Sequence, residues 1–359
     1  MNKYQKIKDF HGERSKGIGS SDVPILAGLT KQWGSTQLTL WETKTGRRER
    51  WQGNNKTAWG HKLEGLVLKE FLSLRYLPET VEKFYRNYLS GKSYGPFKVM
   101  TECRHPERSY MLAHADLVVI EGHEEFLIKD LAEDLKPVSG AYIVEAKTTG
   151  MMSGKRRKGE VFTGYDKDDM SAQGIPDSVY LQVEHQEYVY DINAAYVAVL
   201  IDTSDYREYG PVIASKNTQE KILAISEKFW NCLESDTPPQ PETWDDVVSM
   251  WPSQKNTTAM ISGEAELEVM GMLEKAKKLK QSQKTTKKKL DEIKNALGIL
   301  IGENQVLQNP DGEIFARTYE KSRESIFSIK EIEKQAPDLA RQIIDLGFIK
   351  RSSWREIKF

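Results

Sequence analysis

The sequence has very few cysteines and no long uncharged apolar run. Its 359 residues include two cysteines, Cys103 and Cys232, which argues against a disulfide framework or a cysteine zinc site and is typical of a reducing cytoplasm. No stretch is long and apolar enough to form a membrane-spanning helix, and residues 1–17 contain no apolar segment of the secretory type. We therefore expect a soluble, cytoplasmic protein with no membrane partner.

The sequence also lacks a large net charge, but its charges are unevenly placed. The formal net charge is -1, with 38% hydrophobic and 29% charged residues, a mixture that can bury a core and excludes wholesale disorder. Residues 270–302 contain nine lysines and three acidic residues. A nucleic-acid-binding protein need not be basic overall if its basic groups are concentrated where the phosphates bind.

The order of predicted elements indicates an α/β domain with a mixed central β-sheet flanked by helices. The predicted elements follow hydrophobic periodicity and turn signals: helices 22–29, 36–44, 57–74 and 177–190, strands 97–103, 110–121, 141–147 and 194–201, and a short helix near 124–135. A proline-rich break at 238–241 closes this domain. The length of the chain leaves room for further modules.

The predicted domains are 1–237, a proline-containing linker at 238–262, a lysine-rich heptad helical arm at 263–302, and a C-terminal α+β module of hairpin, helix and strand at 303–359. The heptad seam consists of Val269, Met272, Ala276, Leu279, Gln283, Thr286, Leu290, Ile293, Leu297 and Leu300. Such a seam favours pairing with another helix, as in a coiled coil. The lysines either lie along DNA or only keep a helical hairpin soluble.

Three ionisable residues fall on predicted strands. Residues i and i+2 of a strand share a face, so Glu145 and Lys147 are expected to project together, and Asp116 lies in an apolar strand upstream. Two carboxylates beside a lysine are suited to magnesium-dependent phosphodiester hydrolysis, because hard oxygens bind Mg²⁺ and the ammonium orients or activates the attacking water. The alternative is an ordinary ion pair at a strand end.

Further polar residues lie on two predicted helices. Glu64 shares a mostly apolar helical face and is expected to point inward, although a boundary glutamate could also reach water. Gln182 and Gln186 are one helical turn apart, with Glu184 between them. These amides could bind a phosphate-bound water or a metal-bound carboxylate, or they could be ordinary surface residues.

Six short strings occur in one order along residues 14–202: GIGSSDVPILAGL, LWETKTG, WGHKLE, HADL, VEAK and YLQVEHQ. Together they resemble the PD-(D/E)XK nuclease superfamily, whose core resembles that of restriction endonucleases, and more closely the YqaJ-like viral recombinases, which are related to lambda-type phage exonucleases. The resemblance implies a metal site formed by Asp116, Glu145 and the carbonyl of Ala146, with Lys147 as the catalytic lysine. It also implies supporting roles for Glu64 and Gln182.

The same resemblance implies DNA contacts near the N-terminus. The turn Ser20–Ser21 is assigned to DNA, with Ser21 at the 5′-phosphate, and an arginine of lambda-type members corresponds to Arg14. The basic loop residues Lys155, Arg156, Arg157 and Lys158 are expected to bind the DNA backbone; the alternative is a solvated charged loop. Two departures from the family pattern are Leu117 after Asp116 and Glu184 in place of a second glutamine. The glutamate either adds a metal-side carboxylate or weakens phosphate contacts.

The expected function is that of a Mg²⁺-dependent exonuclease of phage-type recombination, in which Mn²⁺ can substitute. By resemblance it resects double-stranded DNA ends 5′→3′ and leaves 3′ single strands for an annealing protein. The resemblance also implies a homo-oligomer, for which the trimer of lambda-type relatives is the expected form, and a bacterial host cytoplasm. The alternatives are a RecB-like or endonucleolytic nuclease of different polarity, and a catalytically silent DNA-binding or assembly protein.

Overall fold

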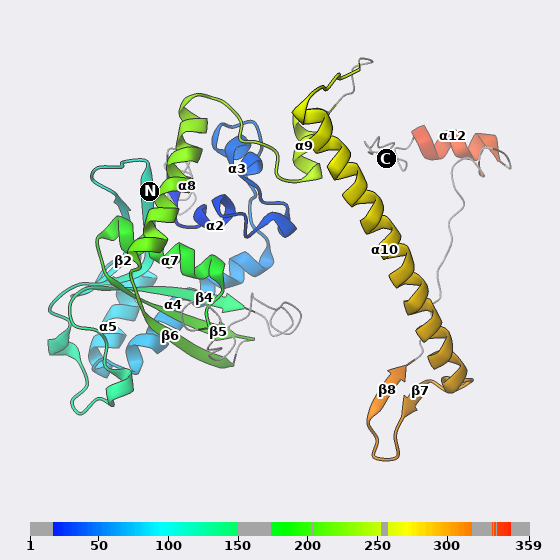
Figure 1. The fold of residues 1–359 in the computed structure, drawn as a ribbon. Helices are drawn as coiled ribbons and strands as arrows, with labels where there is room; N and C mark the ends of the chain where they lie inside the picture. Colours follow the sequence, from blue (N-terminus) through cyan, green and yellow to red (C-terminus); the bar gives the residue numbers. More distant parts are fainter. Residues whose placement is uncertain are drawn as a thin grey trace. The chain divides into compact units, whose positions relative to one another are not determined.

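The computed structural model describes residues 17–149, 174–202, 204–252, 258–317, 332, 334 and 336–345. The chain divides into two compact units, Met1–Pro252 and Ser253–Phe359 (Figure 1). None of the helices in the described ranges is both long and apolar enough to cross a membrane.

The first unit is built on a mixed sheet with the strand order β1-β3-β4-β5-β6, and β2 pairs with the other edge of β3. The strands are β1 (Ile18–Gly19), β2 (Phe97–Arg104), β3 (Met111–Val119), β4 (Tyr142–Thr149), β5 (Ala194–Ile201) and β6 (Asp205–Ile213). Pairs β1–β3 and β4–β5 are parallel, and the other pairs are antiparallel. The expected mixed α/β class is confirmed.

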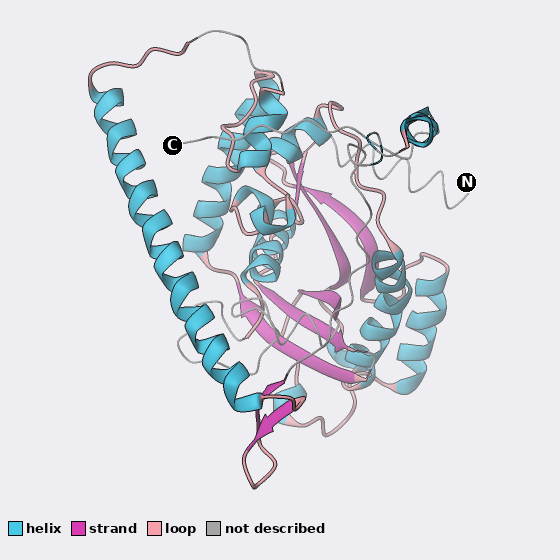
Figure 2. Ribbon diagram, turned by 90° about the vertical axis from the view of Figure 1, so that its right-hand side faces the viewer, coloured by secondary structure: helices cyan, strands magenta, loops and turns pink. Residues whose placement is uncertain are grey.

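Alternate residues of the strands point to opposite faces of the sheet, and each face is covered by helices (Figure 2). Leu117, Val144 and Tyr196 pack with α4 (Asn55–Ser73) and α5 (Pro78–Leu89). Val118, Ile143 and Val197 pack instead with α7 (Asp177–Tyr190). Burial on both faces explains why β5 is a continuous apolar run rather than an alternating one.

A third cluster joins the N-terminal helices to the end of the unit. Helices α2 (Val23–Leu26), α3 (Gln37–Lys44) and α8 (Lys216–Glu234) contribute its buried side chains, which are Leu26, Leu38, Leu40, Trp41 and Phe229, together with Ile18 of β1. This packing places the turn after β1 against the helical layer that also contains α7.

The segment predicted as a linker at 238–262 is partly structured. Helix α9 (Trp244–Met250) begins at a capping box, and its Asp246 carboxylate accepts a hydrogen bond from the Thr36 hydroxyl at 2.7 Å. Glu242 forms an ion pair with Lys31 at 2.9 Å. The first compact unit therefore extends to Pro252 rather than ending at 237, because these polar contacts attach residues 242–250 to the start of α3.

Most predicted elements of the first unit are present, with three differences. Helix α2 is four residues long, shorter than the predicted 22–29. The segment 124–135 contains two short 3₁₀ turns, η2 (Glu124–Phe126) and η3 (Glu133–Leu135), in place of a helix. Helices α5 and α8 and strand β6 were not predicted from the sequence.

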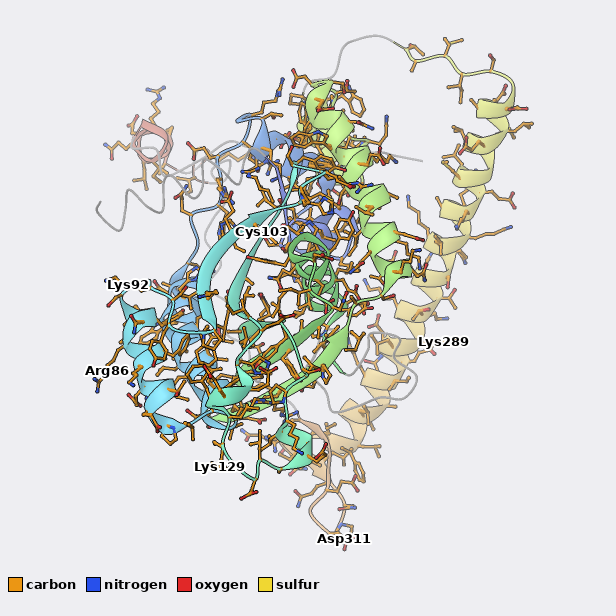
Figure 3. All side chains as sticks on the ribbon, turned by 90° about the vertical axis from the view of Figure 1, so that its left-hand side faces the viewer. Arg86, Lys92, Cys103, Lys129, Lys289 and Asp311 are labelled. Atoms are coloured by element: carbon orange, nitrogen blue, oxygen red, sulfur yellow. The ribbon has the colours of Figure 1, made fainter. Side chains whose placement is uncertain are left out.

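The second unit contains the long helix α10 (Glu264–Ile301), the hairpin β7 (Val306–Gln308) and β8 (Ile314–Arg317), and helix α12 (Pro337–Asp345). The predicted heptad segment is a single helix. Most of its large apolar side chains are exposed, for example Leu279 at 61% and Ile299 at 82%, whereas Ile301 at its end is buried. Figure 3 shows side chains, including that of Lys289, projecting outward along its length.

Candidate active site

Asp116 lies on β3, between the segment of this strand that pairs with β1 and the segment that pairs with β4. Strand β1 pairs with β3 at residues 111–112, and β4 pairs with it at residues 117–119. Between these two pairings, residues 113–116 face no strand on this edge within the described part of the chain. The Asp116 carboxylate instead accepts a hydrogen bond from the backbone N–H of Ala146 at 2.8 Å. The opening of the sheet thus brings Asp116 to the end of β4.

Strand β4 carries the other two charged residues, Glu145 and Lys147, near the point where it leaves the core. Its first four residues are buried and the following ones are progressively exposed, so Glu145 is 2% exposed while Lys147 reaches the surface in part. The Lys147 ammonium forms an ion pair with Glu145. As the strand period predicts, the two side chains project from the same face.

Two amides of α7 fix the buried carboxylate of Glu145. Gln182 Nε2 donates to Glu145 Oε1 at 2.6 Å, and Gln186 Nε2 donates to Glu145 Oε2 at 2.8 Å. Lys147 Nζ also donates to Gln182 Oε1 at 3.1 Å. Of the interpretations open from the sequence, the amides thus bind a carboxylate, as their spacing of one helical turn permits.

Glu64 approaches the cluster of Asp116, Glu145 and Lys147 from the helical layer on the opposite face of the sheet. It lies on α4, and its Oε1 accepts a hydrogen bond from the Tyr88 hydroxyl at 2.8 Å. Helix α4 comes close to the end of β4, since a Cβ added at Gly60 would lie 3.4 Å from Thr148 Oγ1. A Cβ at Gly65 would collide with the Tyr88 ring, so this glycine allows the ring to pack against α4. The Glu64 side chain is 24% exposed and lies between Tyr88 and the exposed His61, whose Nδ1 is 3.6 Å from Glu64 Oε2, so Glu64 stands at the boundary of the site.

The cluster has more negative than positive charge. Burial, followed by the charges of Glu145 and Glu64, raises the pKa of Asp116 well above its ordinary value. Burial opposes the charge of Lys147, but the nearby carboxylates of Glu145 and Asp116 prevail and raise the pKa of its ammonium. Three carboxylates thus surround one cation, and a divalent cation would balance the excess.

The predicted metal ligands offer the donor atoms that a hard divalent cation binds. Asp116 and Glu145 offer carboxylate oxygens, and Ala146 offers a carbonyl oxygen, which are the donors that Mg²⁺ prefers. In the part of the chain that the structure describes, no group of three Cys, His, Asp or Glu side chains is gathered closely enough to hold a metal. The set of two carboxylates and a carbonyl that the family resemblance implies therefore stays a prediction.

Ser20 and Ser21 form the serine turn after β1. Both were predicted to contact DNA, but their side chains differ in exposure. Ser21 is exposed, whereas Ser20 is buried, with 4% of its surface exposed. Ser20 Oγ lies 3.1 Å from His185 Nδ1 of α7. The Ser20 hydroxyl is therefore directed into the protein, and a contact between residue 20 and DNA stays a prediction.

Glu184 is also placed away from the carboxylate cluster. It is fully buried, and both of its carboxylate oxygens accept from the backbone N–H of Ser215, at 3.2 and 3.0 Å. Burial raises its pKa. The possibility that Glu184 adds a metal-side carboxylate is wrong, because residue 184 lies on another side of α7 from residues 182 and 186.

Arg14 and the basic residues Lys155, Arg156, Arg157 and Lys158 lie outside the described residues. Three residues that the sequence did not single out support the site: Tyr88, which binds Glu64; Lys44, which binds the serine turn; and His185. Lys44 and His185 occur within strings that carry the family resemblance, and that was the available signal. Tyr88 had none.

The sequence matches the model of the YqaJ-like viral recombinase domain over residues 9–193, just over half of the chain. It is 28% identical over 222 residues to the uncharacterized protein YqaJ of Bacillus subtilis (strain 168), a match that covers 61% of this chain and 54% of that protein. The chain thus spans about half the length of this curated relative.

Among solved structures, the alkaline exonuclease LHK-Exo of Laribacter hongkongensis is 11% identical, with a TM-score of 0.41 over 64% of this chain and 94% of that one. Its complex with dAMP gives 12% identity, the same TM-score of 0.41, and coverage of 64% and 94%. The family match, the curated relative and the order of the motifs on the fold agree, and the chain belongs to the YqaJ-like viral recombinase domain family.

Proposed function

We propose that this protein is a divalent-metal-dependent nuclease that hydrolyses phosphodiester bonds at double-stranded DNA ends. One observation supports this proposal above all: Asp116, Glu145 and Lys147 meet where the sheet opens between β1 and β4, with Glu145 held by two amides of α7. Buried charged groups are costly to keep. A silent binding protein would have no physical reason to retain this arrangement.

Mg²⁺ would be held by the carboxylates of Asp116 and Glu145 and by the carbonyl of Ala146, and Mn²⁺ would substitute for it. When bound, the cation would polarise the scissile phosphate and lower the pKa of a coordinated water. Burial first, and then the negative charges of Glu145 and Glu64, raise the pKa of Asp116 in the protein alone, and this excess of negative charge supports the assignment. Metal binding requires deprotonated carboxylates, so it would draw Asp116 into its charged form.

The protein's own side chains would orient the reactants around that site. Lys147, held between Glu145 and Gln182, would position or activate the attacking water with its ammonium. Gln182 and Gln186 keep Glu145 in one orientation, and Glu64 with Tyr88 closes the site from the α4 side. Fixed donors of this kind reduce the reorganisation that the reaction requires.

The finer parts of the proposal come from the family resemblance. The nuclease would act 5′→3′ on one strand, with the exposed Ser21 and Arg14 at the 5′-phosphate and with Lys155, Arg156, Arg157 and Lys158 on the DNA backbone. The resulting 3′ single strand would pass to a single-strand annealing protein, and the nuclease would act as a homo-oligomer, with a trimer as the expected form.

The test is digestion of linear duplex DNA that carries a label at either the 5′ or the 3′ end of one strand. A covalently closed circle serves as the matched substrate without ends, and each reaction is run with Mg²⁺, with Mn²⁺ or with EDTA. Early release of the 5′ label alone, only with metal and without cutting of the circle, is the expected result.

Other products would reject particular parts of the proposal. Cutting of the circle would indicate an endonuclease, and early release of the 3′ label would reverse the polarity. DNA binding without any cleavage, in the absence of a metal-induced change in melting temperature, would identify a silent binding protein instead.

A further inference from the structure

The Ser20–His185 contact joins two segments that are far apart in the sequence. Ser20 follows β1, and His185 lies on α7, 165 residues later, with 3.1 Å between Oγ and Nδ1. Ser20 is 4% exposed and His185 is 0% exposed. No residue in the described ranges hydrogen bonds to His185 Nε2. Within these ranges, the imidazole therefore hydrogen bonds through Nδ1, to Ser20.

His185 is uncharged under ordinary conditions. Burial lowers the pKa of its imidazole to about 4, so the ring stays neutral at the pH values at which DNA is stable. A neutral imidazole can either donate to the serine oxygen or accept from its hydroxyl. It therefore serves as a fixed hydrogen-bond partner rather than as a cation for phosphate.

Asp22 and Lys44 also hold the backbone of the serine turn. Gly19 N–H donates to Asp22 Oδ2 at 2.8 Å, and Lys44 Nζ forms an ion pair with the same oxygen at 2.8 Å. Lys44 Nζ also donates to the Gly17 carbonyl at 2.6 Å. These contacts fix the backbone of the turn, while the inward Ser20 hydroxyl ties it to α7 and the adjacent Ser21 is exposed.

Helix α7 also holds the buried carboxylate of the candidate active site. Gln182 and Gln186 bind Glu145 at 2.6 and 2.8 Å, and His185 lies between them in sequence, one turn from Gln182. We propose that His185 is a positioning residue, which holds the Ser20–Ser21 turn at a fixed place relative to Glu145. The inference rests on the proposed function, in which this turn binds the terminal phosphate of the DNA strand.

The test compares the dissociation constants for short duplexes that end in a 5′-phosphate or a 5′-hydroxyl, measured in EDTA so that no cleavage occurs. The wild-type protein is expected to bind the phosphorylated end about tenfold more tightly. His185→Leu, which fills the space but forms no hydrogen bond, should reduce this ratio to about one. His185→Asn places an amide near the Nδ1 position and should restore much of the ratio.

His123→Leu is the matched control. His123 is also fully buried, and its Nδ1 lies 3.0 Å from the Tyr76 hydroxyl in another part of the core. His123 Nε2 also lies 3.1 Å from the Gly140 carbonyl oxygen, so this variant removes more hydrogen bonding than His185→Leu does, and it should still keep the phosphate preference of the wild-type protein. Ser20→Ala provides a second, smaller change at the proposed contact, and should abolish the preference even if His185→Leu fails to fold.

The inference is overturned if the wild-type protein shows no phosphate preference, if Ser20→Ala or a folded His185→Leu keeps the preference, or if His123→Leu abolishes it equally. A parallel digestion with Mg²⁺ reports on the nuclease activity separately. Loss of the phosphate preference in a protein that still cleaves DNA at saturating concentration would support the positioning role. Failure of the wild-type protein to cleave would reject the proposed nuclease without changing the binding result.

Discussion

Glu187 is a buried acid that the candidate active site does not use. It is 1% exposed, and neither carboxylate oxygen has a hydrogen-bond partner in the described part of the chain. Burial, with a smaller contribution from the charge of Glu184, raises the pKa of Glu187 to about 9. The residue is therefore protonated in the folded protein at neutral pH, while its ordinary pKa of 4.5 applies in the unfolded chain.

This difference makes stability depend on pH. Because the folded-state pKa of this acid is raised, its contribution to stability is fully present below about pH 4.5 and is lost as pH rises towards about 9. The free energy of unfolding should fall by up to ~1.4 kcal/mol per pH unit in this window. Glu187→Gln should remove that slope and melt at a higher temperature than the wild-type protein at pH 9.

The measurement is thermal or urea unfolding at pH 5, 7 and 9. Glu220→Gln, an exposed glutamate on α8, is the control and should follow the wild-type pH profile. Identical pH profiles for Glu187→Gln and the wild-type protein would show that Glu187 does not titrate in this way.

At the scale of elements, α9 is joined to the first unit mainly through Asp246. This residue is 2% exposed and accepts hydrogen bonds from the Thr36 hydroxyl at 2.7 Å and from the backbone N–H groups of Glu242 and Thr243 at 2.9 and 3.0 Å. Asp246→Ala would leave three donors without this acceptor, two of them backbone groups at the start of α9. Such losses cost about 1–3 kcal/mol per buried group.

We therefore expect Asp246→Ala to lower the free energy of unfolding of the first unit by at least about 3 kcal/mol in total. Denaturant unfolding followed by tryptophan fluorescence measures this change. Asp245→Ala, one residue earlier and exposed, should change stability by less than about 0.5 kcal/mol. Equal losses in the two variants would contradict the anchoring role of Asp246.

Local patterns predicted the central elements well. Helix α7 and strand β5 have the predicted bounds, 177–190 and 194–201, because a periodic segment and a wholly apolar run are each bounded by turn residues. The predicted helix at 22–29 ends early, because Gly28 adopts a positive φ of 74° and closes the chain into a turn. The segment 124–135 does not form one helix, because Asp130 adopts a positive φ of 59° between the two short turns.

Long-range partners could not be predicted. The strand period placed Glu145 beside Lys147, and helical spacing placed Gln182 and Gln186 on one side of α7. Nothing local indicated that Ser20 would face His185, or that Glu184 would bind the backbone of Ser215. These contacts depend on how distant segments pack, and a single sequence does not specify that packing through its local pattern.

At the scale of the whole molecule, the positive charge is concentrated on α10. Its lysines are exposed, and we expect several of them to bind DNA phosphates. Replacing Lys277, Lys280, Lys284 and Lys287 with glutamine should weaken DNA binding at low salt. The slope of log K against log salt concentration should decrease by about 0.9 for each phosphate that the variant no longer neutralises.

Binding titrations at several salt concentrations measure that slope. A control with glutamine at Lys83, Lys92 and Lys129, which are exposed in the first unit, should keep the wild-type slope; Lys92 and Lys129 are labelled in Figure 3. An unchanged slope in the α10 variant would mean that these lysines serve solubility or helix pairing alone.

Our proposal for the whole protein is that the cluster of Asp116, Glu145 and Lys147 hydrolyses DNA. Its most direct test is the Mg²⁺-dependent rate of nucleotide release from linear duplex DNA at saturating concentration, for the wild-type protein and Lys147→Met. Lys136→Met is the matched control, since Lys136 pairs with Glu133 at the surface and is 53% exposed. We predict a loss of at least about 100-fold for Lys147→Met and an unchanged rate for Lys136→Met. If the Lys147→Met protein retained the wild-type rate, Lys147 would have no part in the hydrolysis and the proposed catalytic cluster would be wrong.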